Sequence, residues 1–240
     1  MITTSDKQFW TRLHDLPRAV LYKAKCQIPS LNPHYYLRRI SGLIHVGANA
    51  GQERRLYAKY NLNVLWVEAN PEAFEKLQQN IKPYPSQIAV NRLITERDDA
   101  DHVFHIANND GESSSILALH DHKKIWPGVK FDRDIRLKSI TLDSLIKKLR
   151  KRVVEYQALV IDTQGAELLV LKGATGILRG LEYVRVEAPD FEAYSGCAKV
   201  DDVVEFLRKF QFRIIRKDKF PQPVDDCGQY YDLLFRRTDR

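Results

Sequence analysis

The chain has 240 residues, 44% of them hydrophobic, and a net charge of +7 from 38 Lys and Arg against 31 Asp and Glu. This length predicts one α/β domain with a substantial core and an appended segment, and argues against two full domains. Three widely spaced cysteines indicate neither a zinc site nor a disulfide framework, and no signal peptide or apolar run of about 20 residues is found, so we expect a soluble, cytoplasmic protein.

The first forty residues predict a helical extension to the domain that follows. Residues 5–25 have apolar side chains at helical spacing, and Pro17 is expected to kink or split this helix. We expect the segment 1–40 to serve as a strut or lid on the domain of residues 41–240. A basic helix lying on a membrane surface is the alternative. Residues 32–35 predict a turn before a short helix.

The next stretch, residues 43–53, predicts a buried strand that ends in a tight glycine turn and opens a helix. Gly47 and Gly51 permit positive φ and a close approach of the backbone. A second strand then ends at Glu68, 21 positions after Gly47. At that spacing an acidic side chain reaches the ribose hydroxyls of a ligand that lies across the first turn.

The glycine spacing indicates the kind of nucleotide. A dinucleotide site requires G-x-G-x-x-G, in which the middle glycine admits a pyrophosphate, whereas Asn49 occupies that position here. Asn tolerates the left-handed region and bonds to nearby backbone. A ligand made of an adenosine and a small zwitterion fits better, which predicts S-adenosylmethionine. An ordinary turn without a ligand is the alternative.

Helices and strands alternate through the rest of the first half. A helix is expected over residues 70–80, with Pro71 in its first turn, where the missing N–H has no cost. Strands are expected over residues 88–94 and 103–107. The segment 108–115 is a loop by composition, since Asn, Asp, Gly and Ser compete with regular backbone pairing.

The second half predicts five more strands and three more helices. One helix starts after Thr141 and runs to about Arg152, and its basic end complements the helix dipole, so the positive charge alone does not predict nucleic-acid binding. The other helices are expected over residues 165–173 and 203–210. The expected strands cover residues 136–140, 158–161, 183–186, 212–215 and 230–235.

The order of these elements predicts a mostly parallel sheet with one antiparallel edge. The strand at 158–161 is an almost unbroken apolar run that ends at Asp162, and the strand at 183–186 ends at Glu187 before Pro189 stops it. No helix fits between the last two strands. We therefore expect them to pair as an antiparallel hairpin at the edge of the sheet.

Several blocks of the sequence together resemble the FkbM family of S-adenosylmethionine-dependent methyltransferases. The resemblance covers roughly residues 41–235, and its most specific block is Asp-Thr-Gln-Gly-Ala-Glu at 162–167. It rests further on residues 45–53, 67–71, 113–117, 170–174 and 186–187. It implies a Rossmann-like class I methyltransferase fold with a seven-stranded sheet. It also implies methylation of hydroxyl oxygens of sugars or other secondary metabolites.

The resemblance and the predicted sheet together assign candidate residues to the cofactor. Many methyltransferases have an acidic residue where this chain has His45. The expected cofactor-binding residues are His45, Gly47, Asn49, Gly51, Glu68 and Asn70.

Methyl transfer to a hydroxyl needs alignment and a group that takes one proton. Histidine has a suitable pKa, and the resemblance places a histidine at His122, for which a surface position is the alternative. Asp162 and Glu187 stand at the carboxyl ends of central strands, where either could orient the acceptor or act as the base. Glu167 is expected to cap or pair within its own helix. The substrate-binding candidates are Asn109, Ser113, Ser114, Ser115, His120 and Gln164.

Other interpretations stay open. The spacing of His120, Asp121, His122 and Asp162 does not require a metal, so no metal is expected. The alternatives to a sugar O-methyltransferase are an RNA methyltransferase, suggested by the basic balance, and a non-catalytic partner protein that has kept the fold. The expected partner is a small-molecule or glycan acceptor rather than nucleic acid. A membrane contact through the N-terminal helix and a homodimer stay open.

Overall fold

The computed structural model describes residues 32–149, 155–222 and 228–239. The chain divides into two units, Met1–Arg39 and Ile40–Arg240. In the first unit, the Asn32 side chain accepts a hydrogen bond of 2.8 Å from the His34 N–H, and the 3₁₀ helix η1 (Tyr35–Arg39) follows, which confirms the predicted turn and short helix. The helix predicted over residues 5–25 lies outside the described residues.

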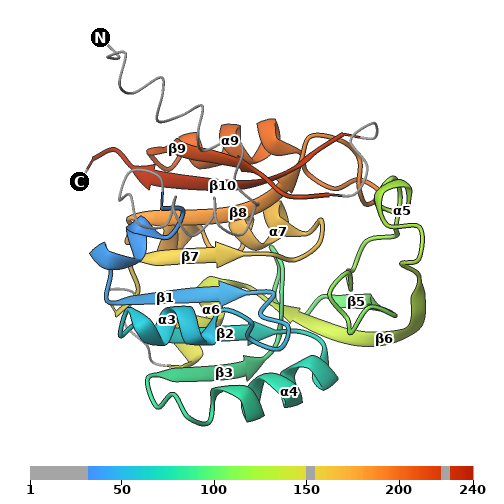
Figure 1. Cartoon of the computed structure of the whole chain (residues 1–240), viewed down its shortest axis with the longest axis horizontal. Helices are drawn as coiled ribbons and strands as arrows, with labels where there is room; N and C mark the ends of the chain where they lie inside the picture. Colours follow the sequence, from blue (N-terminus) through green and yellow to red (C-terminus); the bar gives the residue numbers. More distant parts are fainter. Residues whose placement is uncertain (1–31, 150–154, 223–227, 240) are drawn as a thin grey trace, which may run out of the picture. The chain divides into compact units, whose positions relative to one another are not determined.

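The second unit is built on a seven-stranded sheet (Figure 1). Its strands, in spatial order, are β3 (Gln87–Asn91), β2 (Asn63–Glu68), β1 (Gly42–Val46), β7 (Ala158–Ile161), β8 (Tyr183–Pro189), β10 (Tyr230–Arg237) and β9 (Phe212–Lys219). The first five run parallel, whereas β10 is antiparallel to both β8 and β9. This order confirms the predicted Rossmann-like fold with an antiparallel edge.

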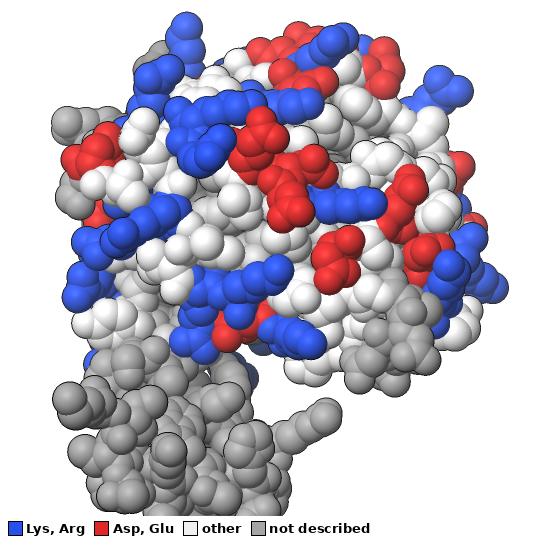
Figure 2. All heavy atoms as spheres, turned by 90° about the horizontal axis from the view of Figure 1, so that it is seen from above, with Lys and Arg blue, Asp and Glu red and all other residues white. Residues whose placement is uncertain are grey.

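The excess of positive charge is not gathered into one region of the face shown in Figure 2. Lys and Arg side chains on this face alternate with Asp and Glu. Exposed ion pairs occur in the unit, such as Lys138 with Asp101 at 3.1 Å. The mixture of charges on the face in Figure 2 differs from the single basic stripe that a nucleic-acid backbone requires.

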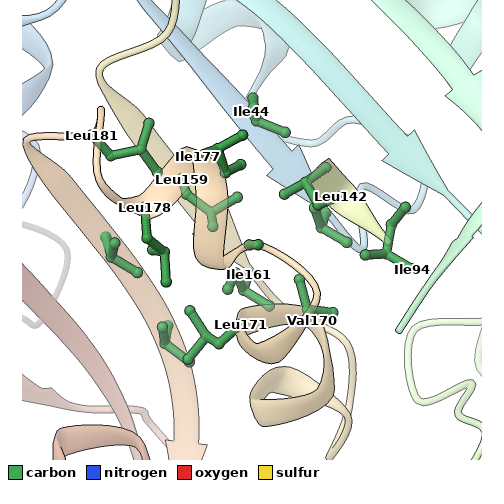
Figure 3. Packing of buried hydrophobic residues seen from close by; sticks show 14 of the residues in the cluster. Ile44, Ile94, Leu142, Leu159, Ile161, Val170, Leu171, Ile177, Leu178 and Leu181 are labelled. Carbon is green, nitrogen blue, oxygen red and sulfur yellow. The ribbon is translucent and has the colours of Figure 1, made fainter. Parts of the chain in front are cut away.

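One face of the sheet is covered by four helices. The helices of the unit are α3 (Arg54–Lys59), α4 (Pro71–Ile81), α5 (His122–Ile125), α6 (Leu142–Lys148), α7 (Glu167–Lys172), α8 (Thr175–Leu178) and α9 (Val200–Arg208). Buried side chains of α6 to α9 pack on alternate residues of the central strands in one hydrophobic core. Figure 3 shows Leu159 and Ile161 of β7 meeting Leu171 and Ile177 from the helices.

The opposite face of β1 and β2 packs against α3 through aromatic rings. Trp66 is fully buried, and its ring stacks on His45 at 5.0 Å and lies 5.2 Å from Tyr57 of α3. The indole N–H of Trp66 donates to the Gln87 side chain at 3.0 Å, so burial leaves this donor satisfied. Burial of each of these large rings contributes about 2–3 kcal/mol.

Two predicted strands differ from the structure. The run 88–94 is divided: β3 ends at Asn91, and the Arg92 N–H still donates to the Glu68 carbonyl at the end of β2. β4 (Leu93–Ile94) instead joins β5 (Asp101–Ala107) and β6 (Phe131–Ile140) in a separate three-stranded sheet. β6 starts five residues before the predicted strand 136–140. The sequence did not predict this first part because it is largely exposed and polar and lacks an apolar pattern.

Most of the remaining boundaries agree to within three residues, although β9 continues to Lys219, four residues beyond the predicted strand 212–215. Thr141 caps α6 by accepting from the Ser144 N–H at 3.2 Å, although the predicted end of this helix near Arg152 lies outside the described residues. β8 does not end at Glu187 as predicted but continues two residues further, to Pro189. Glu187 therefore lies within the ladder, opposite Asp232 of β10.

Candidate active site

A cavity of about 470 Å³ opens at the carboxyl ends of β1, β2, β7 and β8. This edge is where open α/β sheets bind ligands, and the volume is in the range of small-molecule sites. The glycine turn lines it, together with most residues of the segment 109–116 and His122 of α5.

The glycine turn has the strained backbone that its sequence predicts. Gly47, Asn49 and Gly51 all have positive φ, at 81°, 43° and 72°. A Cβ on Gly47 would lie 1.7 Å from the Asp162 carbonyl oxygen, and one on Gly51 would lie 2.6 Å from Leu77. These glycines therefore let the turn pack closely against the chain after β7 and against α4.

Glu68 lies at the tip of β2 directly beside this turn. Its carboxylate accepts two hydrogen bonds of 2.7 Å, from the backbone N–H groups of Asn49 and Asn70. Burial raises the pKa of Glu68, while these two N–H groups oppose the shift. Each carboxylate oxygen has a further lone pair, so the side chain can also accept from ribose hydroxyls in the cavity it lines.

His45 lines the cavity at the end of β1 but is held by its neighbours. Its ring lies against Trp66, and its Nδ1 is 3.2 Å from the Tyr57 hydroxyl and 4.0 Å from a Glu53 carboxylate oxygen. Burial lowers the pKa of His45 to about 4. The ring is therefore neutral near pH 7 and does not neutralise Glu53.

His122 is buried in the cavity wall rather than lying on the surface. Its Nε2 is 3.1 Å from the Ser113 hydroxyl, its Nδ1 is 2.7 Å from the Tyr230 hydroxyl, and its ring lies 4.7 Å from that of Trp126. Burial lowers the pKa of His122 to about 4, so this imidazole is neutral and already engaged at both nitrogens. It joins the polar loop to β10.

Asp162 and Glu187 both line the cavity, at neighbouring central strands. Asp162 accepts from the Gln164 amide at 2.7 Å, and burial with the nearby Glu167 and Glu53 raises the pKa of Asp162 to about 7. Burial and the Asp162 charge raise the pKa of Glu187 well above its usual value. A carboxylate with such a pKa suits proton transfer near neutral pH.

The third acidic side chain of this region has a structural role. Glu167 is fully buried and accepts hydrogen bonds of 2.8 Å from the Thr163 N–H and 3.0 Å from the Gly165 N–H. It thereby closes the turn between β7 and α7, whereas the sequence predicted that it caps or pairs within its own helix.

The structure brings eleven of the fifteen predicted site residues to the cavity wall. They are His45, Gly47, Asn49, Glu68, Asn109, Ser113, Ser114, His122, Asp162, Gln164 and Glu187. The other four lie behind or outside it. Gly51 packs on Leu77, Asn70 caps α4 and donates its N–H to Glu68, Ser115 donates to the Gln164 carbonyl, and His120 bonds to the Glu192 carbonyl.

Other residues that line the cavity are not among those predicted from the sequence. They include Glu53, Arg92, Phe104, Glu112, Trp126, Phe220 and Tyr230. Trp126 follows the polar loop and directly precedes Pro127-Gly128, which indicates a turn. That turn could have predicted that Trp126 lies beside the site. Phe220 and Tyr230 come from the C-terminal hairpin, and only the fold brings them to the cavity.

The described part of the chain also bears on metals and membranes. Within residues 32–149, 155–222 and 228–239, no three His, Cys, Asp or Glu side chains are grouped to hold a metal ion. None of the helices in this described part is long and apolar enough to cross a membrane.

The sheet order, the glycine turn with Glu68 and the cavity above them define a Rossmann-like S-adenosylmethionine-dependent methyltransferase. A family model described as the methyltransferase FkbM domain matches residues 45–214, and the chain belongs to this family. The predicted enzyme class, family and cofactor are thereby confirmed.

Two characterised relatives resemble the chain. It is 24% identical over 204 residues to the 2-O-methyltransferase NoeI of Sinorhizobium fredii, covering 82% of this chain and 79% of the relative. It is 29% identical over 142 residues to the hexuronic acid methyltransferase AglP of Haloferax volcanii, covering 59% of this chain and 53% of the relative. A solved structure, magnesium protoporphyrin IX methyltransferase from Synechocystis with bound S-adenosylhomocysteine, has a TM-score of 0.49 at 8% identity and covers 98% of this chain and 95% of its own.

Proposed function

We propose that the chain transfers a methyl group from S-adenosylmethionine to a hydroxyl oxygen of a sugar or glycan. Its two relatives support this acceptor by name, one as a 2-O-methyltransferase and the other as a hexuronic acid methyltransferase. The observation that carries the proposal is the placement of Asp162 and Glu187 in the same cavity as the glycine turn and Glu68.

The residues present fit the cofactor. Glu68 offers lone pairs to the ribose, and Ala69, Leu93 and Phe104 provide apolar surface beyond β2 that suits an adenine ring. When bound, S-adenosylmethionine supplies an electrophilic methyl group. The task of the protein is then to align a hydroxyl and to hold its proton.

Asp162 is the proposed general base, with Glu187 as its neighbour. Burial brings the pKa of Asp162 to about 7, at which a carboxylate accepts a proton far better than an ordinary exposed one. His122 is less suited, since burial lowers its pKa to about 4 and both ring nitrogens are engaged. We assign His122 the positioning of Ser113 and Tyr230.

The remaining wall of the cavity suits a sugar. Trp126, Phe220 and Tyr230 present ring surface to the cavity, and Asn109 and Ser113 bring an amide and a hydroxyl to it. Such a mixture of apolar faces and a few polar groups orients a molecule that has both hydroxyls and C–H faces.

Mass spectrometry tests the proposal. Purified protein is incubated with S-adenosylmethionine carrying a deuterated methyl group and with separate panels of neutral sugars, amino sugars, uronic acids and RNA. We expect a labelled product in a sugar panel that depends on Asp162. A product in RNA alone, with binding that falls steeply with salt, would favour the RNA alternative, and no product in single-turnover assays of any panel would favour a non-catalytic partner.

A further inference from the structure

The cavity extends to both sides of Glu68, and the two sides differ in charge. Toward β3 it is lined by Ala69, Arg92 and Leu93, whereas toward β7 it is lined by Glu53 and Asp162. The strand order β3-β2-β1-β7 fixes these as opposite sides. A nucleoside held at Glu68 with its base over the apolar side therefore directs its amino-acid portion toward Glu53.

Glu53 has no fixed side-chain partner in the part of the chain that the structure describes, in contrast to Glu68 and Asp162 of the same cavity. It is the N-cap residue of α3 but makes no capping hydrogen bond through its side chain, which is 35% exposed. Within the described residues, its one ion-pair neighbour is His45 at 4.0 Å. That ring is neutral, since burial lowers its pKa to about 4. Glu53 thus keeps an uncompensated carboxylate at the cavity.

Three acidic side chains near Glu53 already have hydrogen-bond donors. Glu68 accepts from two backbone N–H groups, Asp162 accepts from Gln164, and Glu167 closes its own turn. Glu53 also lies near enough to Asp162 for its charge to act on that carboxylate. A cation between β1 and β7 would relieve this repulsion.

We infer that Glu53 holds the α-ammonium group of the methionine portion of the cofactor. Glu53 is a cofactor-binding residue in this proposal. It supplies the negative charge that the neutral His45, at the end of β1, does not provide. The inference concerns the methyl donor alone, so it does not depend on the class of acceptor.

Titration calorimetry with two ligands tests the inference without any turnover. S-Adenosylhomocysteine carries the amino-acid portion, whereas 5′-methylthioadenosine has the same nucleoside and sulfur without it. We expect Glu53→Gln to weaken binding of S-adenosylhomocysteine about tenfold or more, because a hydrogen-bonded charge pair is lost. Binding of 5′-methylthioadenosine should stay within about twofold, which also shows that the variant is folded.

Three further variants sharpen the comparison. Glu68→Ala should weaken both ligands, and Glu75→Gln, an equal change at an exposed position of α4, should weaken neither. Arg92→Gln tests the opposite orientation. The inference is overturned if Glu53→Gln leaves S-adenosylhomocysteine binding unchanged, if it weakens both ligands equally, or if the selective loss appears in Arg92→Gln instead.

Discussion

The carboxylate of Glu68 accepts a hydrogen bond of 2.7 Å from the backbone N–H of Asn49, which ties the tip of β2 to the left-handed residue of the glycine turn. The same carboxylate also accepts from the Asn70 N–H, where α4 begins. One side chain therefore holds together the turn, the second strand and the following helix. This arrangement makes Glu68 both a structural anchor and the proposed ribose ligand.

Removal of this carboxylate should affect stability and binding together. Glu68→Ala leaves two buried N–H groups without their charged acceptor, and we expect a loss of about 2–4 kcal/mol in the free energy of unfolding. S-Adenosylhomocysteine binding should fall at least about tenfold. Urea denaturation and calorimetry measure the two effects, with Glu75→Gln as control. Unchanged binding would show that the cofactor lies elsewhere.

Substitution of Gly47 should be more severe than its size suggests. In Gly47→Ala the new Cβ would lie 1.7 Å from the Asp162 carbonyl oxygen at a φ of 81°, so either the turn or the chain after β7 must move. We expect a loss of about 3 kcal/mol or more in unfolding free energy, measured by urea denaturation.

Two other glycines, Gly196 and Gly128, serve as comparisons that separate the steric cost of an added Cβ from the cost of a positive φ. Gly196 also has a positive φ of 71°, but a Cβ added there would meet nothing within 4 Å, so Gly196→Ala should lose about 1–2 kcal/mol. Gly128 has open space and no positive φ, and Gly128→Ala should be near neutral. Equal losses for Gly47→Ala and Gly196→Ala would contradict the packing explanation.

These cases show why some features could be predicted from the sequence. The strand at Leu43, the turn at Gly47 and the acid at Glu68 are specified by residues close together in the chain, and each has a local physical reason. The pairing of Glu68 with Asn49 then follows from the predicted adjacency of β1 and β2.

Long-range features could not be predicted in this way. β6 begins with exposed polar residues, so no periodicity indicates the second sheet. Tyr230 bonds to His122 across 108 positions of the sequence, and Phe220 reaches the cavity from the hairpin. The sequence marks Glu53 only as a residue at the start of a helix. Its lack of a capping hydrogen bond is a property of the folded turn and could not be predicted.

The raised pKa of Asp162 predicts a pH-dependent difference in stability. The protonated Asp162 carboxyl group holds its proton more tightly in the folded protein than in the unfolded chain. The stability that this proton contributes is fully present below about pH 4 and is lost as the pH rises through about 7. Asp162→Asn does not titrate. Its stability relative to wild type should therefore increase between pH 5 and pH 8, by on the order of 2 kcal/mol.

Denaturation of both proteins in urea at the two pH values measures this difference, and Asp190→Asn, at a position outside the cavity, serves as the control. A constant stability difference would mean that Asp162 titrates as an ordinary carboxyl group.

The raised pKa of Asp162 also predicts how activity depends on pH. The deprotonated carboxylate is the form that acts as the base, so kcat/KM should rise through about pH 7, and Asp162→Asn should lack this rise.

His122 should behave as a positioning residue. His122→Ala leaves the Ser113 and Tyr230 hydroxyls without their shared partner, and it opens a cavity beside Trp126. We expect a loss of about 2–4 kcal/mol in stability. His122→Gln should keep part of the hydrogen bonding and retain the rise of kcat/KM with pH. Loss of that limb in His122→Gln would instead identify His122 as the base.

Trp126 should affect the acceptor more than the methyl donor. Its ring lines the cavity beside His122 and Tyr230. Trp126→Ala removes apolar surface, so the KM for the sugar found in the labelled panel should rise about tenfold or more. Calorimetry with S-adenosylhomocysteine should show donor affinity within about twofold of wild type, because the donor contacts are retained.

Trp126→Phe, which keeps a ring at the same position, should restore most of the acceptor affinity. Equal losses of donor and acceptor affinity would place Trp126 in the donor site.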